Sequence, residues 1–248
     1  MSYRDTILVY AERQYPVYRQ IALDIHARTE TSNHEYFACE TLTKQLLAEG
    51  FEVKVDVAGH PTGFTGTSRS KKPGPTLCFL AEYDALMGLG HGCGHNLFGA
   101  TPLLAAASLK QVIDEVGGEI RVYGTSGAEG GENGSAKGSF VREGFFRDVD
   151  AALCVRPGSD HHELTHEKIA CAPFHIEFRG KAAHAAANPQ DGVNALDALI
   201  LTFNAIGLLR QQLPQDVRIH GIITHGGATR QTPFPIIPKE NSMSARPP

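Results

Sequence analysis

The sequence predicts an α/β domain built on a parallel or mixed sheet, followed by a smaller α+β domain. Apolar runs alternate with helical patterns along the first part of the chain, and glycine-rich loops follow two of these runs. This alternation is typical of sheets whose functional sites lie at strand ends. After about His166 the pattern changes to alternating strands around one long helix. We therefore expect two domains, at 1–166 and 167–248.

Composition limits the classes of protein that fit. The chain has 248 residues, 42% of them hydrophobic, which is enough for a sizeable core. A net charge of -4 with scattered basic residues argues against nucleic-acid binding. The five cysteines show no disulfide spacing, and the start MSYRDTILVY does not resemble a signal peptide. The longest apolar stretch is too short to cross a bilayer. We expect a cytoplasmic protein with no nucleic-acid or membrane partner.

The first elements follow from periodicity and capping signals. A helical region is expected over 4–28, with a break or kink at Pro16. Ser32 and Glu35 have the spacing of a capping box and predict a second helix that ends at Gly50. The run FEVKVDV then alternates apolar and polar residues, as a half-buried strand does.

The next segments supply the centre of the expected sheet. A stretch rich in Gly, Pro and Ser is expected to be a loop, and the apolar run TLCFLAEY after it a central strand. A helix is expected over about 96–116. The strand EIRVYGT, a glycine-rich loop with a short helix, and the buried strand DAALCV come next.

The second part predicts an antiparallel arrangement. CAPFHIEFRG alternates as an antiparallel strand, and RIHGIIT predicts another strand. Between them a helix is expected over about 193–212, with one apolar face formed by Leu196, Ile200, Phe203 and Ile206. The polar tail NSMSARPP is expected to complete no element.

The densest chemical signal is the run LAEYDALMGLGHGCGHNLFGA, in which a strand ends in two acidic residues and opens into a loop. Cys93 and His95 in this loop could reach one pair of metal ions, and Gly92 and Gly94 allow a sharp backbone path. A buried cysteine and a capping histidine are the alternative. Asp84 could hold a ring N–H of a ligating histidine, or could cap a turn.

Other candidates lie after later strands. Glu129 follows EIRVYGT and is a candidate carboxylate ligand, or a solvated loop residue; Glu132 is a weaker candidate. Cys154 is expected to pack in the core. His184 lies among small residues that would let another surface approach, or is a surface histidine. A local histidine cluster is expected to be a polar loop rather than a metal site: His161, His162 and His166.

Together these segments resemble the zinc aminoacylase and carboxypeptidase-G type metallopeptidases, the M20 family. The similar motifs are LAEYDAL, GHGCGHNLFGA, VYGT with AEGG, DVDAAL with PG, FRGKAAHAAANPQDGVNALDA, and HGIIT with GG. The branch is similar to p-aminobenzoyl-glutamate hydrolases and β-alanyl-lysine-type dipeptidases. The resemblance implies a mixed-sheet catalytic domain that binds two metal ions, zinc or another divalent metal. It also implies an inserted α+β dimerisation domain, and this second domain would be incomplete in this chain.

The resemblance also implies roles for individual residues. Cys93, His95 and Glu129 fall on metal-ligand positions, and Asp84 on the carboxylate that orients a ligand. His184 falls on the histidine that reaches across a dimer to the substrate and helps to hold the oxyanion. The implied reaction is attack of a metal-activated water on an amide of a dipeptide or N-acyl amino acid.

Departures from the family pattern change the expected activity. Ala128 stands where the family has its general base, and a methyl group cannot take a proton. Arg156 stands where this branch has a histidine ligand, and a guanidinium does not ordinarily bind a metal. The final histidine ligand of the family would lie beyond residue 248.

Three hypotheses follow from these observations. The first is an amidohydrolase or dipeptidase of this family whose activity is weak or absent. The second is a non-catalytic relative that forms a homodimer or pairs with a full-length homologue. The third is a truncated gene product.

Overall fold

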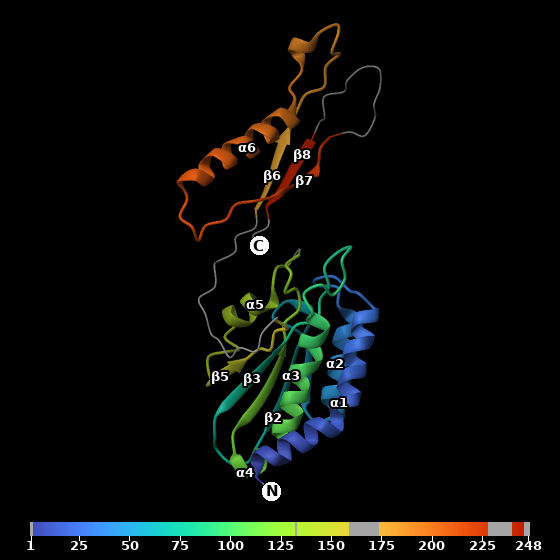
Figure 1. Ribbon diagram of the computed structural model, residues 1–248, viewed down its shortest axis with the longest axis vertical. Helices are drawn as coiled ribbons and strands as arrows, with labels where there is room; N and C mark the ends of the chain where they lie inside the picture. Colours follow the sequence, from blue (N-terminus) through green and yellow to red (C-terminus); the bar gives the residue numbers. More distant parts are fainter. Residues whose placement is uncertain (1, 132, 159–173, 228–239, 246–248) are drawn as a thin grey trace. The chain divides into compact units, whose positions relative to one another are not determined.

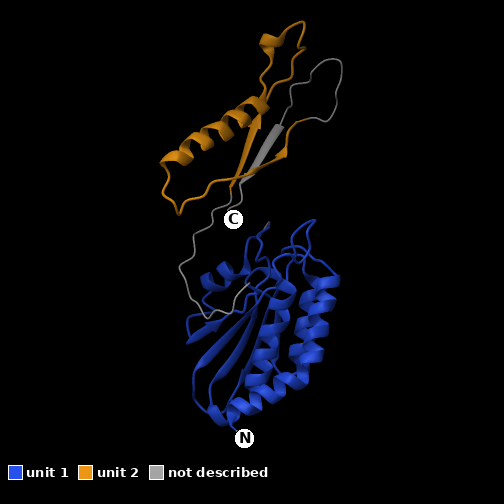
Figure 2. Ribbon diagram, in the orientation of Figure 1, with its two compact units in different colours: residues 1–161 blue, residues 162–248 orange. Residues whose placement is uncertain are grey.

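The computed structural model describes residues 2–131, 133–158, 174–227 and 240–245. The chain forms two compact units, 1–161 and 162–248, which Figure 2 shows in different colours. This division falls close to the expected boundary at residue 166, in a stretch outside the described residues. Whether the units are a catalytic and a dimerisation domain stays a prediction.

The first unit is built on a mixed five-stranded sheet, which confirms the predicted fold class. The strand order is β1-β2-β4-β3-β5. Neighbours β1, β2 and β4 run antiparallel, whereas β4, β3 and β5 run parallel. The bounds are β1 Glu52–Val57, β2 His60–Arg69, β3 Thr76–Ala81, β4 Glu119–Gly124 and β5 Ala151–Leu153.

Helices cover both faces of this sheet (Figure 1). Side chains alternate between the two faces along β3. Phe79 and Ala81 pack on one face with α1, α2 and α3. Cys78 and Leu80 pack on the other face with α5. This double coverage explains why the central strand is an apolar run. The helices are α1 Tyr3–Ala27, α2 Tyr36–Ala48, α3 His95–Lys110, α4 Ile113–Val116 and α5 Ala136–Arg142.

The capping box predicted for the second helix is wrong. Helix α2 begins only at Tyr36, and its N-cap makes no side-chain cap bond. The Ser32 hydroxyl instead donates to Asp84 at 2.7 Å. The Glu35 carboxylate accepts from the backbone N–H of Gly127 at 2.8 Å. The side chains of Ser32 and Glu35 therefore bind loops that are distant in the sequence, and they do not cap α2.

Two other helix signals concern the start of the chain and the start of α2. Helix α1 is continuous through Pro16, so of the break or kink expected there the break does not occur. The start of α2 is held by Glu30, whose carboxylate accepts from the N–H groups of Phe37 and Ala38, each at 3.0 Å. A carboxylate at this end also meets the positive end of the helix dipole.

The expected loop before the central strand contains the strand β2. Its Gly, Thr and Pro content is typical of a loop, but hydrogen bonds to β1 and β4 on its two sides hold it extended. Gly66 in β2 lies against helix α2, where an added Cβ would come within 2.8 Å of the Leu46 side chain. Strand β5 is exposed rather than buried, and the expected helix over 96–116 is divided into α3 and α4.

The second unit has a three-stranded antiparallel sheet in the order β6-β8-β7, against which helix α6 packs. Its tail does form an element, because β8 is the central strand, and the prediction for NSMSARPP is wrong. Along α6, Ala195 and Leu199 are buried, whereas Ile200 of the expected face is exposed. The bounds are β6 Phe174–Arg179, α6 Ala195–Leu209, β7 Ile222–His225 and β8 Glu240–Ala245, with 3-10 turns Pro189–Asp191 and Arg210–Gln212.

No helix within the described residues is both long enough and apolar enough to cross a membrane.

We predict that Leu46→Ala destabilises the first unit far more than Leu47→Ala. Leu46 is 0% exposed and Leu47 is 59% exposed, although they are neighbours in α2. Emptying a core position costs about 2–5 kcal/mol of unfolding free energy, while an exposed substitution changes it by less than about 0.5 kcal/mol. Urea unfolding followed by circular dichroism measures both. Equal losses would contradict the packing of α2 on β2.

Candidate functional site

The predicted site residues gather where the three parallel strands end. Glu82 and Asp84 follow β3, Glu129 lies in the loop after β4, and Arg156 follows β5. The carboxyl ends of parallel strands share one edge of a sheet, where functional sites of such folds usually lie. The sequence therefore predicted the correct edge for these residues, although it did not single out Glu82.

His95 is the buried first residue of α3 and lies between carboxylates on both sides of its ring. Its Nδ1 is 2.8 Å from Asp84 Oδ1, and its Nε2 is 3.0 Å from Glu82 Oε2. A second carboxylate oxygen, Glu129 Oε1, lies 3.6 Å from Nε2. A ring with acidic partners at both nitrogens is held as a double donor.

These contacts change the pKa of each partner. Burial opposes the charged form of His95, but its hydrogen bonds to Asp84 and Glu82 outweigh burial and raise its pKa to about 9. Burial likewise opposes ionisation of Asp84, yet the hydrogen bonds from His95, the Glu129 backbone and Ser32 lower its pKa. At neutral pH the pair is therefore an imidazolium and a carboxylate.

Gly94 allows the loop to enter α3 at this point. It has a φ of 76°, in the left-handed region that favours glycine. A Cβ at Gly94 would also lie 2.7 Å from the Pro157 ring. Of the two glycines predicted to shape this turn, Gly94 has the left-handed conformation and Gly92 does not.

Glu82 is the functional candidate that sequence reasoning missed. Its side chain is 0% exposed and accepts from Lys137 Nζ at 2.8 Å. Arg156 Nη2 donates to both of its oxygens, at 2.9 and 3.0 Å. Although burial opposes its charge, His95, Lys137 and Arg156 hold the pKa of Glu82 well below its usual range. The available signal was its position two residues before Asp84, at the end of the same strand.

Asp84 connects three parts of the first unit. Besides His95, it accepts from the Ser32 hydroxyl at 2.7 Å and from the backbone N–H of Glu129 at 2.8 Å. This arrangement matches the geometry expected of a carboxylate that orients a histidine ligand. Its role beside a metal stays a prediction.

The loop that carries Ala128 and Glu129 is anchored by buried carboxylates. The N–H of Gly127 donates to Glu35, which also accepts from the Thr62 hydroxyl at 2.7 Å. The N–H of Glu129 donates to Asp84. Ala128 therefore lies between two fixed amides, and its side chain offers neither a donor nor an acceptor.

Cys93 is exposed and lies close to Glu129. A hydrogen bond with Glu129, with burial adding to it, raises the pKa of the Cys93 thiol to about 11. The thiol is therefore protonated at neutral pH, whereas a metal ligand must be a thiolate. The structure thus brings the four predicted residues together, but they bind one another: His95 pairs with Asp84, and Cys93 with Glu129.

The two metal ions implied by the family resemblance do not fit this arrangement. Within the described residues, no three His, Cys, Asp or Glu side chains are placed so as to hold an ion. His95 Nε2 lies 3.0 Å from Glu82, and the Arg156 guanidinium binds the same carboxylate. Arg156 stands at the position where the resemblance implies a histidine ligand. A guanidinium has no lone pair to give and its charge repels a cation.

The remaining candidates lie elsewhere or differ from expectation. Cys154 is exposed rather than packed in the core, and its Sγ lies 3.9 Å from Glu82 Oε1. Four other candidates lie outside the described residues: Glu132, His161, His162 and His166.

His184 belongs to the second unit and follows β6. Its Nδ1 accepts from the backbone N–H groups of Ala186 and Ala187, at 3.2 and 3.1 Å. The proton of the neutral ring therefore lies on Nε2, which makes that atom a donor. The role expected at the substrate of a second copy stays a prediction.

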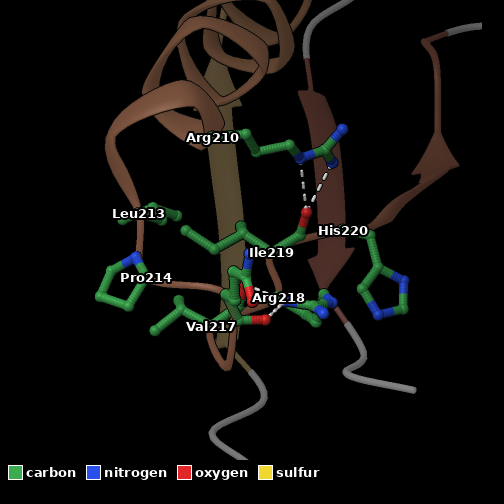
Figure 3. A pocket seen from close by; sticks show the side chains of 8 residues that line it. Arg210, Leu213, Pro214, Val217, Arg218, Ile219 and His220 are labelled. Atoms are coloured by element: carbon green, nitrogen blue, oxygen red, sulfur yellow. Dashed lines mark hydrogen bonds between the residues drawn. The ribbon is translucent and has the colours of Figure 1, made fainter.

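A hollow in the second unit lies between the end of α6 and β7 (Figure 3). Its arginines bind the loop itself: Arg210 donates to the Ile219 carbonyl, and Arg218 donates to the carbonyls of Gln215 and Val217. None of the residues singled out in the sequence lines it. These contacts support the loop, and we assign no binding site to the hollow.

We predict that the stability of the first unit falls as pH rises through about 9, the raised pKa of His95. The protonated ring is the form that binds Asp84 and Glu82, so its stabilisation is fully present below about 6.5, its ordinary pKa. The expected loss is about 1–3 kcal/mol of unfolding free energy.

Chemical unfolding at a series of pH values measures this dependence. His95→Gln should be less stable at neutral pH and show a flatter profile between pH 6.5 and about 9. His34→Gln, at an exposed histidine, is the matched control and should keep the wild-type profile. A wild-type profile as flat as that of His95→Gln would contradict the ion pairs.

Comparisons with known proteins agree with the resemblance. No family model matches the chain. It is 36% identical over 238 residues to one of the p-aminobenzoyl-glutamate hydrolase subunits of Escherichia coli, covering 88% of this chain and 48% of that protein. It is 34% identical over 219 residues to the human Xaa-Arg dipeptidase, covering 82% of this chain and 49% of the relative. The chain spans about half the length of these curated relatives.

Solved structures show the same fold at lower identity. An aminobenzoyl-glutamate utilization protein from Klebsiella pneumoniae superposes with a TM-score of 0.65 at 22% identity, covering 97% of this chain and 69% of the other. A dinuclear metal-binding peptidase of the M20 family from Bacillus subtilis superposes with a TM-score of 0.58 at 18% identity, covering 96% and 64%. The ordered motifs, the mixed sheet and these relatives lead to one conclusion: the chain belongs to the M20 family of metal-dependent peptidases and amidohydrolases.

Proposed function

We propose that this chain is an impaired amidohydrolase, derived from enzymes that cleave the C–N amide bond of a small substrate bearing a free carboxylate. The observation that carries the proposal is Ala128. It lies between the amides of Gly127 and Glu129, which buried carboxylates hold in place. The loop is thus well anchored, but the position implied for the general base carries a methyl group.

The missing base has a large expected effect on rate. General acid–base catalysis contributes about 10²–10⁴-fold to a reaction of this kind. Neighbouring carboxylates are poor substitutes, because Glu82 is buried under cations and Glu129 accepts from the Cys93 thiol. The pKa of Glu82 is lowered by its cationic partners, and a carboxylate with a lowered pKa is a weak proton acceptor.

The proposed substrate class is a dipeptide or an N-acyl amino acid. It is supported by the names of the relatives, which include a p-aminobenzoyl-glutamate hydrolase, an Xaa-Arg dipeptidase and an indole-3-acetyl-aspartic acid hydrolase. Each name describes an amino acid joined through an amide. The half-exposed Arg156 at the site is a positive charge that a substrate carboxylate could meet.

We predict that the full chain shows no hydrolysis above background, and that Ala128→Glu alone does not restore it. A base at residue 128 would not change Arg156, which stands where the family has a histidine ligand and binds Glu82. Release of the amino acid from p-aminobenzoyl-glutamate and a panel of dipeptides, with zinc, manganese or cobalt added, measures turnover.

Ala128→Gln is the matched control, because it has the size of glutamate without a basic carboxylate. Turnover by the unchanged chain, or a gain with Ala128→Glu that Ala128→Gln lacks, would show that the remaining groups suffice for catalysis. Either result would overturn the proposed impairment.

A second candidate function is pairing with another chain, either a copy of this one or a full-length homologue. The second unit carries large exposed apolar side chains on α6 and β7, among them Leu201, Leu208 and Ile222. Exposed apolar surface of this kind often marks an interface. Two relatives are named as the two different subunits of a p-aminobenzoyl-glutamate hydrolase, which supports a mixed assembly.

Light scattering of the purified chain, alone and mixed with an intact homologue, distinguishes these assemblies. The pairing proposal expects a homodimer or a mixed complex, and expects Leu201→Glu with Leu208→Glu to weaken it. A monomer in both samples would contradict the proposal.

We also infer a cytoplasmic location. The described cysteines are free thiols, as expected in a reducing compartment: Cys39, Cys78, Cys93 and Cys154.

A further inference from the structure

Two cationic side chains from different elements meet at the buried Glu82 carboxylate. Lys137 is the second residue of α5, and Arg156 follows β5. Lys137 Nζ lies 2.8 Å from Oε1, and Arg156 Nη2 lies 2.9 and 3.0 Å from the two oxygens. A carboxylate removed from water needs such partners, since an isolated buried charge is very costly.

The two cations lie over Glu82 rather than being buried with it. The Glu82 side chain is 0% exposed, whereas the side chains of Lys137 and Arg156 are 32% and 52% exposed. The Arg156 guanidinium also lies 5.3 Å from the centre of the Phe98 ring, a cation–π contact that holds it in place. The two cationic groups are therefore partners of Glu82 that remain partly open to solvent, while the carboxylate itself is buried.

We propose that Lys137 and Arg156 are built-in counter-ions that take the place of a divalent metal ion at Glu82, so that this site is complete without metal. The charges of Lys137 and Arg156 together equal that of one divalent ion, and the His95 imidazolium lies on the same carboxylate. The proposal rests on the family membership and on the contacts of Glu82, not on the proposed loss of hydrolysis.

Charge balance at Glu82 has two consequences. Carboxylates that converge without a counter-ion repel one another, and a metal site of this kind is destabilised when its metal is removed. Here Glu82 already has its cations. An incoming divalent ion would also meet repulsion from Arg156 and Lys137 at close range. We therefore expect the folded chain to be insensitive to chelators and to bind no ion at Glu82.

The first experiment uses the unchanged full chain, dialysed against chelator and then against zinc or manganese. Elemental mass spectrometry should find far less than one ion per chain. The melting temperature should shift by less than about 1 °C, whereas an ion at about a hundred times its Kd would raise it by about 5–10 °C. An ion retained at one or more per chain and lost in Glu82→Gln would overturn the proposal.

The second experiment removes the built-in charges. Lys137→Gln combined with Arg156→Gln leaves His95 as the remaining cationic partner of Glu82. The double substitution should lower the melting temperature, which zinc or manganese should then raise again. Lys44→Gln combined with Arg147→Gln removes two exposed charges of the same types and should respond to neither change. Destabilisation that no divalent ion reverses would mean that the cations are ordinary salt-bridge partners, and would also overturn the proposal.

A doubly substituted chain that does not fold can be refolded with and without the ions. Recovery only with an ion supports the proposal, and failure to recover with either ion overturns it. None of these measurements contains a substrate. The outcome is therefore independent of whether the chain hydrolyses amides.

Discussion

The buried carboxylate of Glu82 is the constraint on which the rest of the site depends. It lies at the end of β3 and can remain ionised only because His95, Lys137 and Arg156 surround it. These partners come from the start of α3, from α5 and from the end of β5. One desolvated charge thereby connects the elements that follow all three parallel strands, and it holds His95 in position to bind Asp84 on its other side.

Much of the first unit could be predicted from the sequence, because apolar runs identify strands that are buried on both faces. Elements held mainly by backbone pairing could not. Strand β2 is rich in Gly and Thr, and β8 is polar, yet each lies between two strands that hold it extended. The Ser32 and Glu35 pattern failed for a related reason. Both side chains have stronger partners in distant loops than at their own helix end.

The edge of the sheet that carries the candidate site could be predicted from the sequence, but the full set of residues in the site could not. Acidic residues after β3 and β4, and the Cys93–His95 loop, indicated the correct edge of the sheet. The position of Glu82 before Asp84 was a signal, but its partners could not be predicted, because Lys137 and Arg156 are distant in the sequence and burial is a tertiary property. Two departures from the family are physically separate: Ala128 removes a proton acceptor, whereas Arg156 adds a charge where a metal ligand is expected. Reversing one does not reverse the other.

A crystal structure of the 248-residue chain, grown with chelator and then soaked in zinc, would show whether Glu82 keeps its cationic partners or the site takes up an ion. Anomalous diffraction at the zinc absorption edge locates any bound ion. We expect Lys137 and Arg156 on the Glu82 carboxylate, with no anomalous peak among Cys93, His95 and Glu129. A peak at these residues, with the guanidinium displaced from Glu82, would contradict this expectation.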